Sequence, residues 1–166
     1  MDVTNPIGTC SEAEGMNTTA IGTASHAEGM NTFANGAASH AEGSTTIAGG
    51  NAAHTEGYDS ETTADTAHAE GFATNAIGAQ SHAEGNNTTA AGANSHTEGM
   101  NTQTTILGIN AHAEGEGNTA SGRASHVEGG GMDPLGNPAS NLASGAAAHA
   151  EGIGTLAGGF ASHAEY

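Results

Sequence analysis

The sequence has almost no basic residues. Arg123 is the one Lys or Arg, it stands against 18 Asp and Glu, and the formal net charge is −17 at pH 7. Nucleic acids and anionic membrane surfaces are bound through Lys and Arg, so this composition argues against both partners. Within the chain, only the ten histidines can offset the remaining acidic groups.

Cysteine and long apolar runs are also scarce. Cys10 is the single cysteine, which excludes an intramolecular disulfide framework and a cysteine-based zinc site. The start, MDVTNPIGTC, has neither the basic nor the apolar region of a secretory leader, and no stretch approaches the length of a membrane span. We expect export by another route or, because the last repeat stops at SHAEY, a piece of a longer chain.

Bulky side chains are the third shortage. Tryptophan is absent, aromatic residues make up 3%, and glycine reaches 27 of 166 residues. An ordinary globular domain buries large side chains that this sequence does not have. Disordered chains and repeat folds with thin cores tolerate so little bulk, and a regular period favours the repeat fold.

A short motif recurs along the whole chain with a nearly fixed period. The steps between copies are 14 residues six times, then 16, 14, 23 and 14, which is typical of a solenoid with one coil per repeat. The repeats begin at Ser11, Ser25, Ser39, Ala53, Ala67, Ser81, Ser95, Ala111, Ser125, Ala148 and Ser162.

Each 14-residue coil divides into two similar halves, as in SHAEGMN and TFANGAA. Seven residues suit a strand of about five residues and a tight corner, not a helix. Alternation along a strand places Ser25, Ala27 and Gly29 on the inner face, and His26 and Glu28 on the outer face. We expect the glycines to lie at the corners, where they permit positive φ and close approach of backbones.

A Ser/Thr-x-Ala-x-Gly-x-x repeat with two strands per coil resembles the YadA-like head repeat of trimeric autotransporter adhesins. The resemblance covers about residues 8–166 and implies a left-handed parallel β-roll that associates as a trimer. Similar repeats are expected in phage tail and appendage fibres. The sequence departs from the family in carrying His and Glu where an apolar trimer interface is typical, and it lacks the family's stalk and membrane anchor.

Every histidine is followed two residues later by a glutamate. On stacked coils, these residues would form two parallel rows, one of histidines and one of glutamates. Within each row, residues of successive coils would lie about 4.8 Å apart. We call this set the His/Glu ladder: His26, Glu28, His40, Glu42, His54, Glu56, His68, Glu70, His82, Glu84, His96, Glu98, His112, Glu114, His126, Glu128, His149, Glu151, His163 and Glu165.

Three interpretations of the ladder compete. A solvated face does not explain one histidine kept ten times, whereas the opposite strand varies, for example Phe33 with Asn35 and Thr63 with Asp65. We favour an oligomer interface in which imidazoles of one chain pair with carboxylates of the next, layer after layer. This interface predicts raised histidine pKa values, so that its stability is present at low pH and is lost as pH rises.

The third interpretation is a divalent metal. Neutral His with Glu binds Zn, Ni or Cu, and the same His/Glu ladder supplies the candidate ligands. Acidic corner residues such as Asp59, Asp65 and Glu116 would add calcium ligands, but no oxygen-rich calcium loop is present. We therefore expect no obligatory cofactor and keep a metal-binding or metal-assembled filament as an alternative.

The sequence does not indicate an enzyme. A uniform ladder offers no single distinctive pocket, and the chain has no glycine-rich phosphate loop and no nucleophile elbow. Cys10 lies ahead of the first histidine repeat and is interpreted as an inert or cross-linking thiol.

Two coils are longer than the rest. Coil 95–110 has two extra residues, assigned to 103–106, and coil 125–147 has nine extra residues within 129–144. The second insertion holds two of the three prolines and predicts a protruding loop, which is either a contact site or a tolerated insertion. The apolar residues that directly follow the ladder strand are predicted to flank the interface: Met16, Met30, Met100, Tyr58, Phe72 and Ile153.

Together these patterns predict an all-β protein with a lead-in at residues 1–10 and a roll of about eleven coils at 11–166. The predicted function is a structural and adhesive segment of an extracellular trimeric fibre, on a bacterial surface or a phage virion. A host-surface protein or glycan is the candidate partner. The remaining alternative, an ice- or surface-binding solenoid, depends on threonines that mostly fall on inward positions: Thr19, Thr32, Thr46, Thr63, Thr74 and Thr89.

Overall fold

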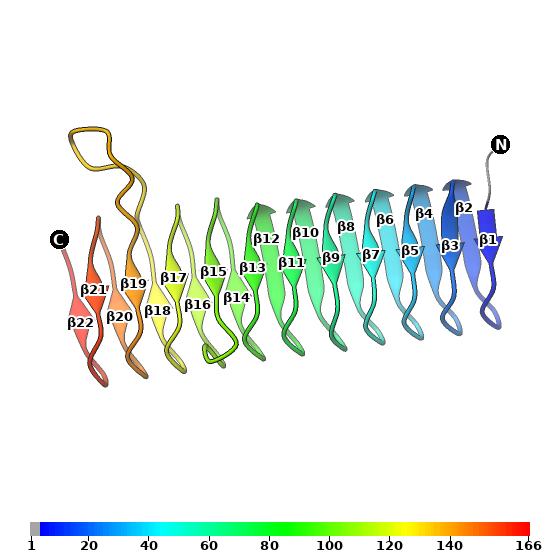
Figure 1. Ribbon diagram of the computed structural model, residues 1–166. Helices are drawn as coiled ribbons and strands as arrows, with labels where there is room; N and C mark the ends of the chain where they lie inside the picture. The colour runs from blue at the N-terminus through cyan, green and yellow to red at the C-terminus, as the bar shows by residue number, and fades with distance from the viewer. Residues whose placement is uncertain (1–3) are drawn as a thin grey trace.

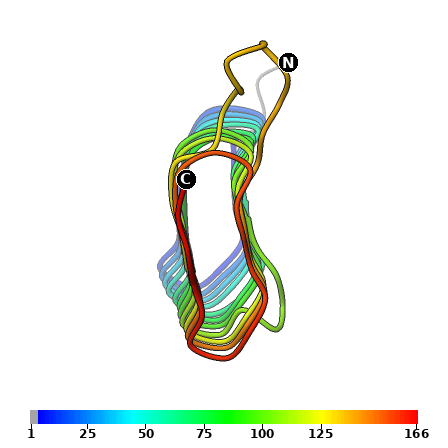
Figure 2. The same ribbon diagram turned by 90° about the vertical axis from the view of Figure 1, so that its left-hand side faces the viewer.

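The computed structural model describes residues 4–166 as a stack of two-stranded coils without a helix. Figure 1 shows the coils side by side in a straight row, with β1 and β22 at opposite ends. Viewed along the stack, the coils superimpose as a flattened tube (Figure 2). The sequence-based prediction of an all-β parallel roll with 14-residue coils is therefore confirmed.

The roll has two parallel sheets of eleven strands each. We call the sheet of odd-numbered strands sheet A and the sheet of even-numbered strands sheet B. Sheet A consists of β1 Thr4–Pro6, β3 Thr18–Ala20, β5 Phe33–Ala34, β7 Ile47–Ala48, β9 Glu61–Thr62, β11 Asn75–Ala76, β13 Thr89–Ala90, β15 Gln103–Thr104, β17 Thr119–Ala120, β19 Leu142–Ala143 and β21 Leu156–Ala157.

Sheet B carries the His/Glu ladder. Its strands are β2 Glu12–Met16, β4 His26–Met30, β6 His40–Ser44, β8 His54–Tyr58, β10 His68–Phe72, β12 His82–Asn86, β14 His96–Thr97, β16 His112–Ala113, β18 His126–Val127, β20 His149–Ala150 and β22 His163–Ala164. Each strand pairs in register with its neighbours, so that His68 lies beside His82 and Glu70 beside Glu84.

The core between the sheets is made of small side chains. Alanines from both sheets, including Ala27 and Ala34, are fully buried, and Val127 is the largest fully buried residue. Threonines and serines share the interior, and Thr55 of sheet B hydrogen-bonds Thr62 of sheet A at 2.8 Å. The alternation of small inward residues with larger outward ones thus follows the sequence-based prediction.

Of the six threonines of the ice-binding alternative, Thr32, Thr46 and Thr74 are buried and cannot present a surface. The other three, Thr19, Thr63 and Thr89, are half-buried or exposed, so the expectation that most point inward is wrong.

The glycine of the ladder strand departs from the predicted inner face. Gly29 is exposed at the end of β4 with φ of +108°, and a Cβ there would lie 2.1 Å from the Gly43 carbonyl oxygen of the next coil. Gly36, at the other corner, has no positive φ, but its Cβ would lie 1.9 Å from the Gly50 oxygen. Glycine is therefore needed at both corners because adjacent coils approach closely, and at the first corner the glycine itself also has positive φ.

The left-handed residues of the second corner are not glycines. Ala24, Ala38 and Ala52 have φ between 51° and 56°, and later residues at the same place in the coil have φ between 50° and 59°. The serine that starts SHAEG stabilises this corner through a hydrogen bond from its side chain. Ser25 Oγ donates to the Gly22 carbonyl at 2.7 Å, and Ser39 repeats the bond to Gly36.

Three positions differ from the sequence-based assignment. Strand β1 pairs with β3, so the roll extends into the segment assigned to the lead-in, of which residues 1–3 lie outside the described part. Glu61 lies opposite Ile47, so the outward residues of that strand are Glu61 and Thr63, while Asp65 lies at the corner. Strand β15 is regular, so the two extra residues of coil 95–110 lie after Thr104, where the exposed Ile106 and Leu107 form a turn.

The nine-residue insertion forms a hairpin that projects beyond the coils, at the top of Figure 2. Met132 and Pro138 form an antiparallel bridge, and Asp133 accepts hydrogen bonds from the Leu135 and Asn137 amides at 2.9 and 2.8 Å. Strands β17 and β19 still pair directly on either side of it. The hairpin is thus an ordered addition to a continuous roll.

Candidate functional site: the His/Glu ladder

All ten ladder histidines lie in one continuous stack on sheet B. Successive rings have centroids 4.7 to 4.9 Å apart and planes within 11° of parallel, for example His68 on His82 at 4.7 Å and 1°. The stack follows from the strand register, because equivalent side chains of neighbouring parallel strands lie one strand spacing apart. The sequence-predicted ladder residues are therefore brought together as predicted.

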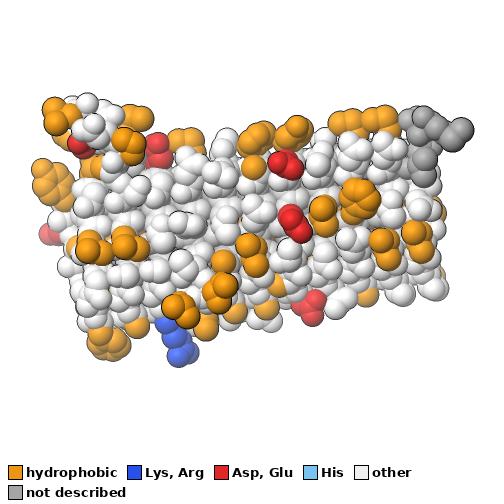
Figure 3. Space-filling model, viewed as in Figure 1, with side chains coloured by type: hydrophobic (Ala, Val, Ile, Leu, Met, Phe, Trp, Pro, Cys, Tyr) orange, Lys and Arg blue, Asp and Glu red, His pale blue; other side chains and the backbone are white. Residues whose placement is uncertain are grey.

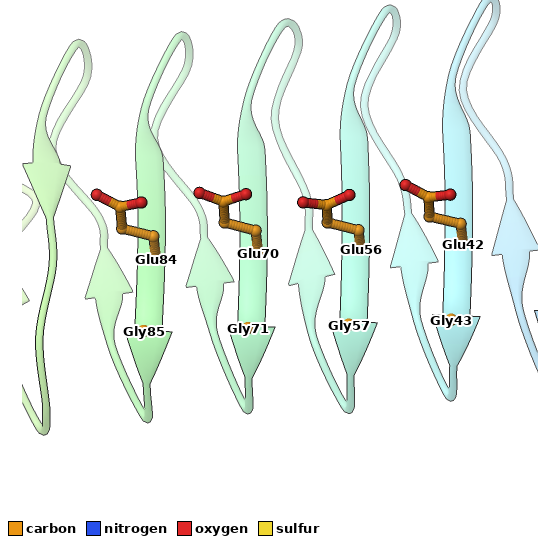
Figure 4. Close-up of a pocket in the computed structure, with 8 residues that line it drawn as sticks. All are labelled: Glu42, Gly43, Glu56, Gly57, Glu70, Gly71, Glu84 and Gly85. Carbon is orange, nitrogen blue, oxygen red and sulfur yellow. The ribbon is translucent and has the colours of Figure 1, made fainter.

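The glutamates form a second row beside the rings. In Figure 4, Glu42, Glu56, Glu70 and Glu84 come from successive strands and turn their carboxylates the same way. A shallow groove runs along this row, lined by these glutamates and by the glycines that follow them. Because glycine has no side chain, the carboxylates are left open to solvent on that side.

Eight carboxylates of the row approach a histidine of the next coil in the same chain. His40 Nε2 lies 3.5 Å from Glu28 Oε1, and His96 Nε2 lies 3.3 Å from Glu84 Oε1. Toward the C-terminal end the contact shortens to a hydrogen bond of 3.1 Å between His149 and Glu128. Eight histidines make this contact: His40, His54, His82, His96, His112, His126, His149 and His163.

This intrachain pairing was not foreseen from the sequence, which suggested a partner across an interface. Pairing between chains stays a prediction. Along most of the ladder the pairs are long for hydrogen bonds. Within residues 4–166, the buried Nε2 atoms without a hydrogen-bond partner belong to His26, His40, His54, His68, His82, His96 and His112.

Within the single chain, three histidine pKa values move opposite to the expectation for an interface. Burial lowers the pKa of His68, His82 and His112 below the ordinary 6.5, and the neighbouring histidine charges lower it further. The nearby glutamates act in the raising direction but are outweighed. These three positions therefore favour the neutral imidazole, because burial and stacked neighbouring cations both disfavour the charged form.

Two carboxyl groups of the row interact directly. A hydrogen bond with Glu98 raises the pKa of Glu114, and burial adds to the increase. The complementary bond lowers the pKa of Glu98. Of the two groups, Glu114 is thus the more readily protonated, since two negative charges side by side are unfavourable.

A second surface runs along the corner that follows the ladder strands. We call Met16, Met30, Tyr58, Phe72 and Met100 the corner stripe; each side chain is 39 to 52% exposed. The Tyr58 and Phe72 rings stack at 5.3 Å and 3°. Strand pairing places Ser44 and Asn86 in the same row, so the stripe is apolar but interrupted. Hydrophobic atoms also gather along the upper edge of the face in Figure 3.

The remaining candidate residues do not join the ladder. Asp59 and Asp65 lie at corners, and the Asp65 carboxylate accepts hydrogen bonds from the Asn51 amide and side chain at 2.9 and 3.1 Å. Ile153 is half-buried, and Cys10 is an exposed free thiol. Residues 4–166 contain no helix of the length and apolar character that crossing a membrane requires.

No protein-family model matches this sequence, and none of the curated proteins matches it. The site is therefore interpreted from its own geometry. A repetitive β-solenoid with stacked His–Glu pairs fits a structural segment of a fibre.

Proposed function

We propose that the protein is a structural and adhesive segment of an extracellular trimeric fibre, on a bacterial surface or a phage virion. The observation that carries the proposal is the uniformity of the ladder. Ten equal rungs in register build one long face, with the same groups presented at every level. An enzyme differs from this pattern because it needs one distinctive pocket.

The thin core supports association with further copies. Alanine, serine and threonine fill the interior, so a single roll buries little apolar volume for its length. In the proposed trimer, sheet B and the corner stripe face the fibre axis, where burial of Met30, Tyr58 and Phe72 adds the missing apolar contact. The resemblance to YadA-like heads supports the same arrangement.

The oligomer is tested by the mass of the metal-free protein in solution, measured by light scattering at pH 6 and pH 8. The expected mass is three times the chain mass of 16.1 kDa. A stable monomer at both pH values would refute the interface.

Two variants of one coil locate the interface. Glu84→Lys places a bulky cation on sheet B, while Thr89→Lys places the same group on the outer face of sheet A. We expect Glu84→Lys to dissociate the trimer and Thr89→Lys to leave it intact, with circular dichroism confirming that both remain folded. Dissociation by Thr89→Lys alone would assign the interface to sheet A.

The hairpin is the proposed contact with a host-surface protein or glycan. It is held by the Asp133 bonds and presents Leu135, which is 86% exposed, so that little conformational freedom is lost on binding. The adhesive role is tested by comparing the binding of labelled intact protein and of a hairpin-deleted protein to host cells. Equal binding would remove the hairpin from the adhesive function.

A further inference from the structure

The long His–Glu contacts of sheet B have a geometry that hydrogen bonding does not explain well. Between His40 and His112 the Nε2–Oε1 distances run from 3.3 to 3.8 Å, beyond the usual range for N–H···O bonds. Two ligands on a tetrahedral ion with bonds of about 2.0–2.1 Å lie about 3.3 Å apart. The spacing of the donor atoms therefore suits an ion between them.

The donor atoms also form triads. One ligand atom from each of His40, Glu42 and His54 lies within 4.8 Å of the other two, and Glu70, His82 and Glu84 form a triad of the alternative composition. The same kind of cluster recurs along the ladder at both ends, for example at His126, Glu128 and His149. Three such donors and one water match the ligand set of a zinc site with an open fourth position.

The protonation states of the donor groups suit a divalent ion such as Zn²⁺. The Nε2 atoms of His40 and His54 are buried and lack a hydrogen-bond partner among residues 4–166. A neutral imidazole offers a lone pair at Nε2 when its proton is on Nδ1, and the carboxylates carry negative charge that a single Arg cannot neutralise. Mixed imidazole and carboxylate donors suit Zn²⁺, Ni²⁺ and Cu²⁺ better than Ca²⁺ or Mg²⁺.

We propose that the His/Glu ladder is a linear array of sites for Zn²⁺-like divalent ions. Each ion is held by imidazole and carboxylate groups of two successive coils, and water completes its coordination. The ion bridges adjacent coils through side chains, in addition to the backbone hydrogen bonds that already join them. This inference goes beyond the fibre function and does not depend on the number of chains in the fibre.

The array has a predictable stoichiometry. Neighbouring triads share residues: His40 belongs both to the triad with Glu28 and to the triad with Glu42, and Glu70 is likewise common to two triads. Ions on adjacent rungs would also lie about 4.8 Å apart and repel strongly. We therefore expect alternate filling, with about one ion per two coils at saturation.

The test uses the full chain, stripped with a chelator and then exposed to Zn²⁺ alone. Elemental analysis after desalting gives the number of bound ions, and competition with a chromophoric chelator gives their affinity. Co²⁺ serves as a spectroscopic probe, because tetrahedral nitrogen and oxygen ligation gives intense visible absorption. We expect about one Zn²⁺ per two coils, a tetrahedral Co²⁺ spectrum, and no comparable binding of Ca²⁺.

Matched variants assign the ligands. His54→Asn and Glu42→Gln each remove one donor of a triad and should weaken binding at that part of the ladder by at least about tenfold. Glu61→Gln removes a carboxylate from sheet A and should leave stoichiometry and affinity unchanged. Circular dichroism in chelator checks that each variant is folded before metal is added.

Three results would overturn the inference: a chain that retains no Zn²⁺, equal losses in Glu61→Gln and Glu42→Gln, or Ca²⁺ binding as tightly as Zn²⁺. The last result would indicate a carboxylate surface without imidazole ligation. Because the mass that tests the trimer is measured in chelator, failure of the metal array and failure of the trimer are distinguished.

Discussion

Alanine in a left-handed backbone conformation is the least expected residue-scale feature of this roll. Ala38 has φ of +54° at the corner before SHAEG, where the Cβ of an L-residue is crowded by its own backbone. The neighbouring exposed Ala37 has no such conformation. The corner is held by adjacent coils, since the Ala38 amide donates to the Thr23 carbonyl at 2.8 Å.

Glycine at position 38 should therefore be tolerated better than glycine at position 37. Ala38→Gly relieves roughly 1–2 kcal/mol of left-handed strain. The greater backbone freedom of glycine in the unfolded chain costs roughly 0.5–1 kcal/mol of stability in return. We expect it to raise the unfolding midpoint slightly, whereas Ala37→Gly lowers it because only the entropy term applies. The measurement is chemical denaturation of both variants, and a larger loss for Ala38→Gly would contradict the argument.

The glycine position at the corner after the ladder strand should tolerate no side chain. Gly57 has φ of +104°, and a Cβ would lie 2.1 Å from the Gly71 oxygen. Strained φ and overpacking each cost about 1–3 kcal/mol, so Gly57→Ala should destabilise the roll by roughly 2–6 kcal/mol. The control is Gly158→Ala, whose Cβ would meet the Ser144 hydroxyl at an ordinary 3.6 Å and whose φ is not positive. A comparable fall of the thermal midpoint in both variants would contradict this explanation.

Residue-scale prediction from the sequence succeeded where one rule was sufficient. Strand alternation placed Ala27 inward and His26 outward, since both faces follow from a period of two. It failed for Gly29, whose positive φ near the end of β4 breaks the alternation, and for Ala38, since propensity disfavours alanine at positive φ. It also missed the contact of His40 with Glu28, which depends on the lean of two side chains toward each other across coils.

At the scale of elements, the hairpin is separable from the roll. Removal of residues 131–139 would leave coil 125–147 with the sequence SHVEGGSNLASGAA, which has 14 residues like most of the other coils. Asn141 would then keep its inward place, where its side chain donates to the Glu128 and Gly152 carbonyls at 2.6 and 2.7 Å. The period in the sequence located this insertion, because the flanking motifs stay recognisable.

We expect the deletion of residues 131–139 to leave the far-ultraviolet spectrum unchanged and the thermal midpoint within a few degrees of the intact protein. The reason is that β17–β19 and β18–β20 already pair across the insertion. Deletion of nine residues from a regular coil, 68–76, is the control and should disrupt the stack because it breaks the register of both sheets. Unfolding of the hairpin-deleted protein would show that the hairpin stabilises the roll.

At the scale of the whole molecule, the ladder couples stability to pH through three of its histidines. Burial and neighbouring histidines lower the pKa of His68, His82 and His112 in the folded chain. Because the unfolded chain then binds more protons, these groups contribute stability that is present above the ordinary pKa of about 6.5. That contribution is lost as pH falls through the lower folded values.

The thermal unfolding midpoint of the chain, measured in chelator, should therefore decrease as the pH is lowered from about 7.5 to about 5.5. This pH range lies above the ordinary glutamate pKa, so glutamates with ordinary pKa values stay charged throughout. A triple variant, His68→Asn with His82→Asn and His112→Asn, should show a smaller fall over the same window. If histidines instead paired with carboxylates of other chains strongly enough to raise their pKa values, the midpoint would rise on acidification. The sign of the slope thus distinguishes a stack of neutral rings held within one chain from a charged interface between chains.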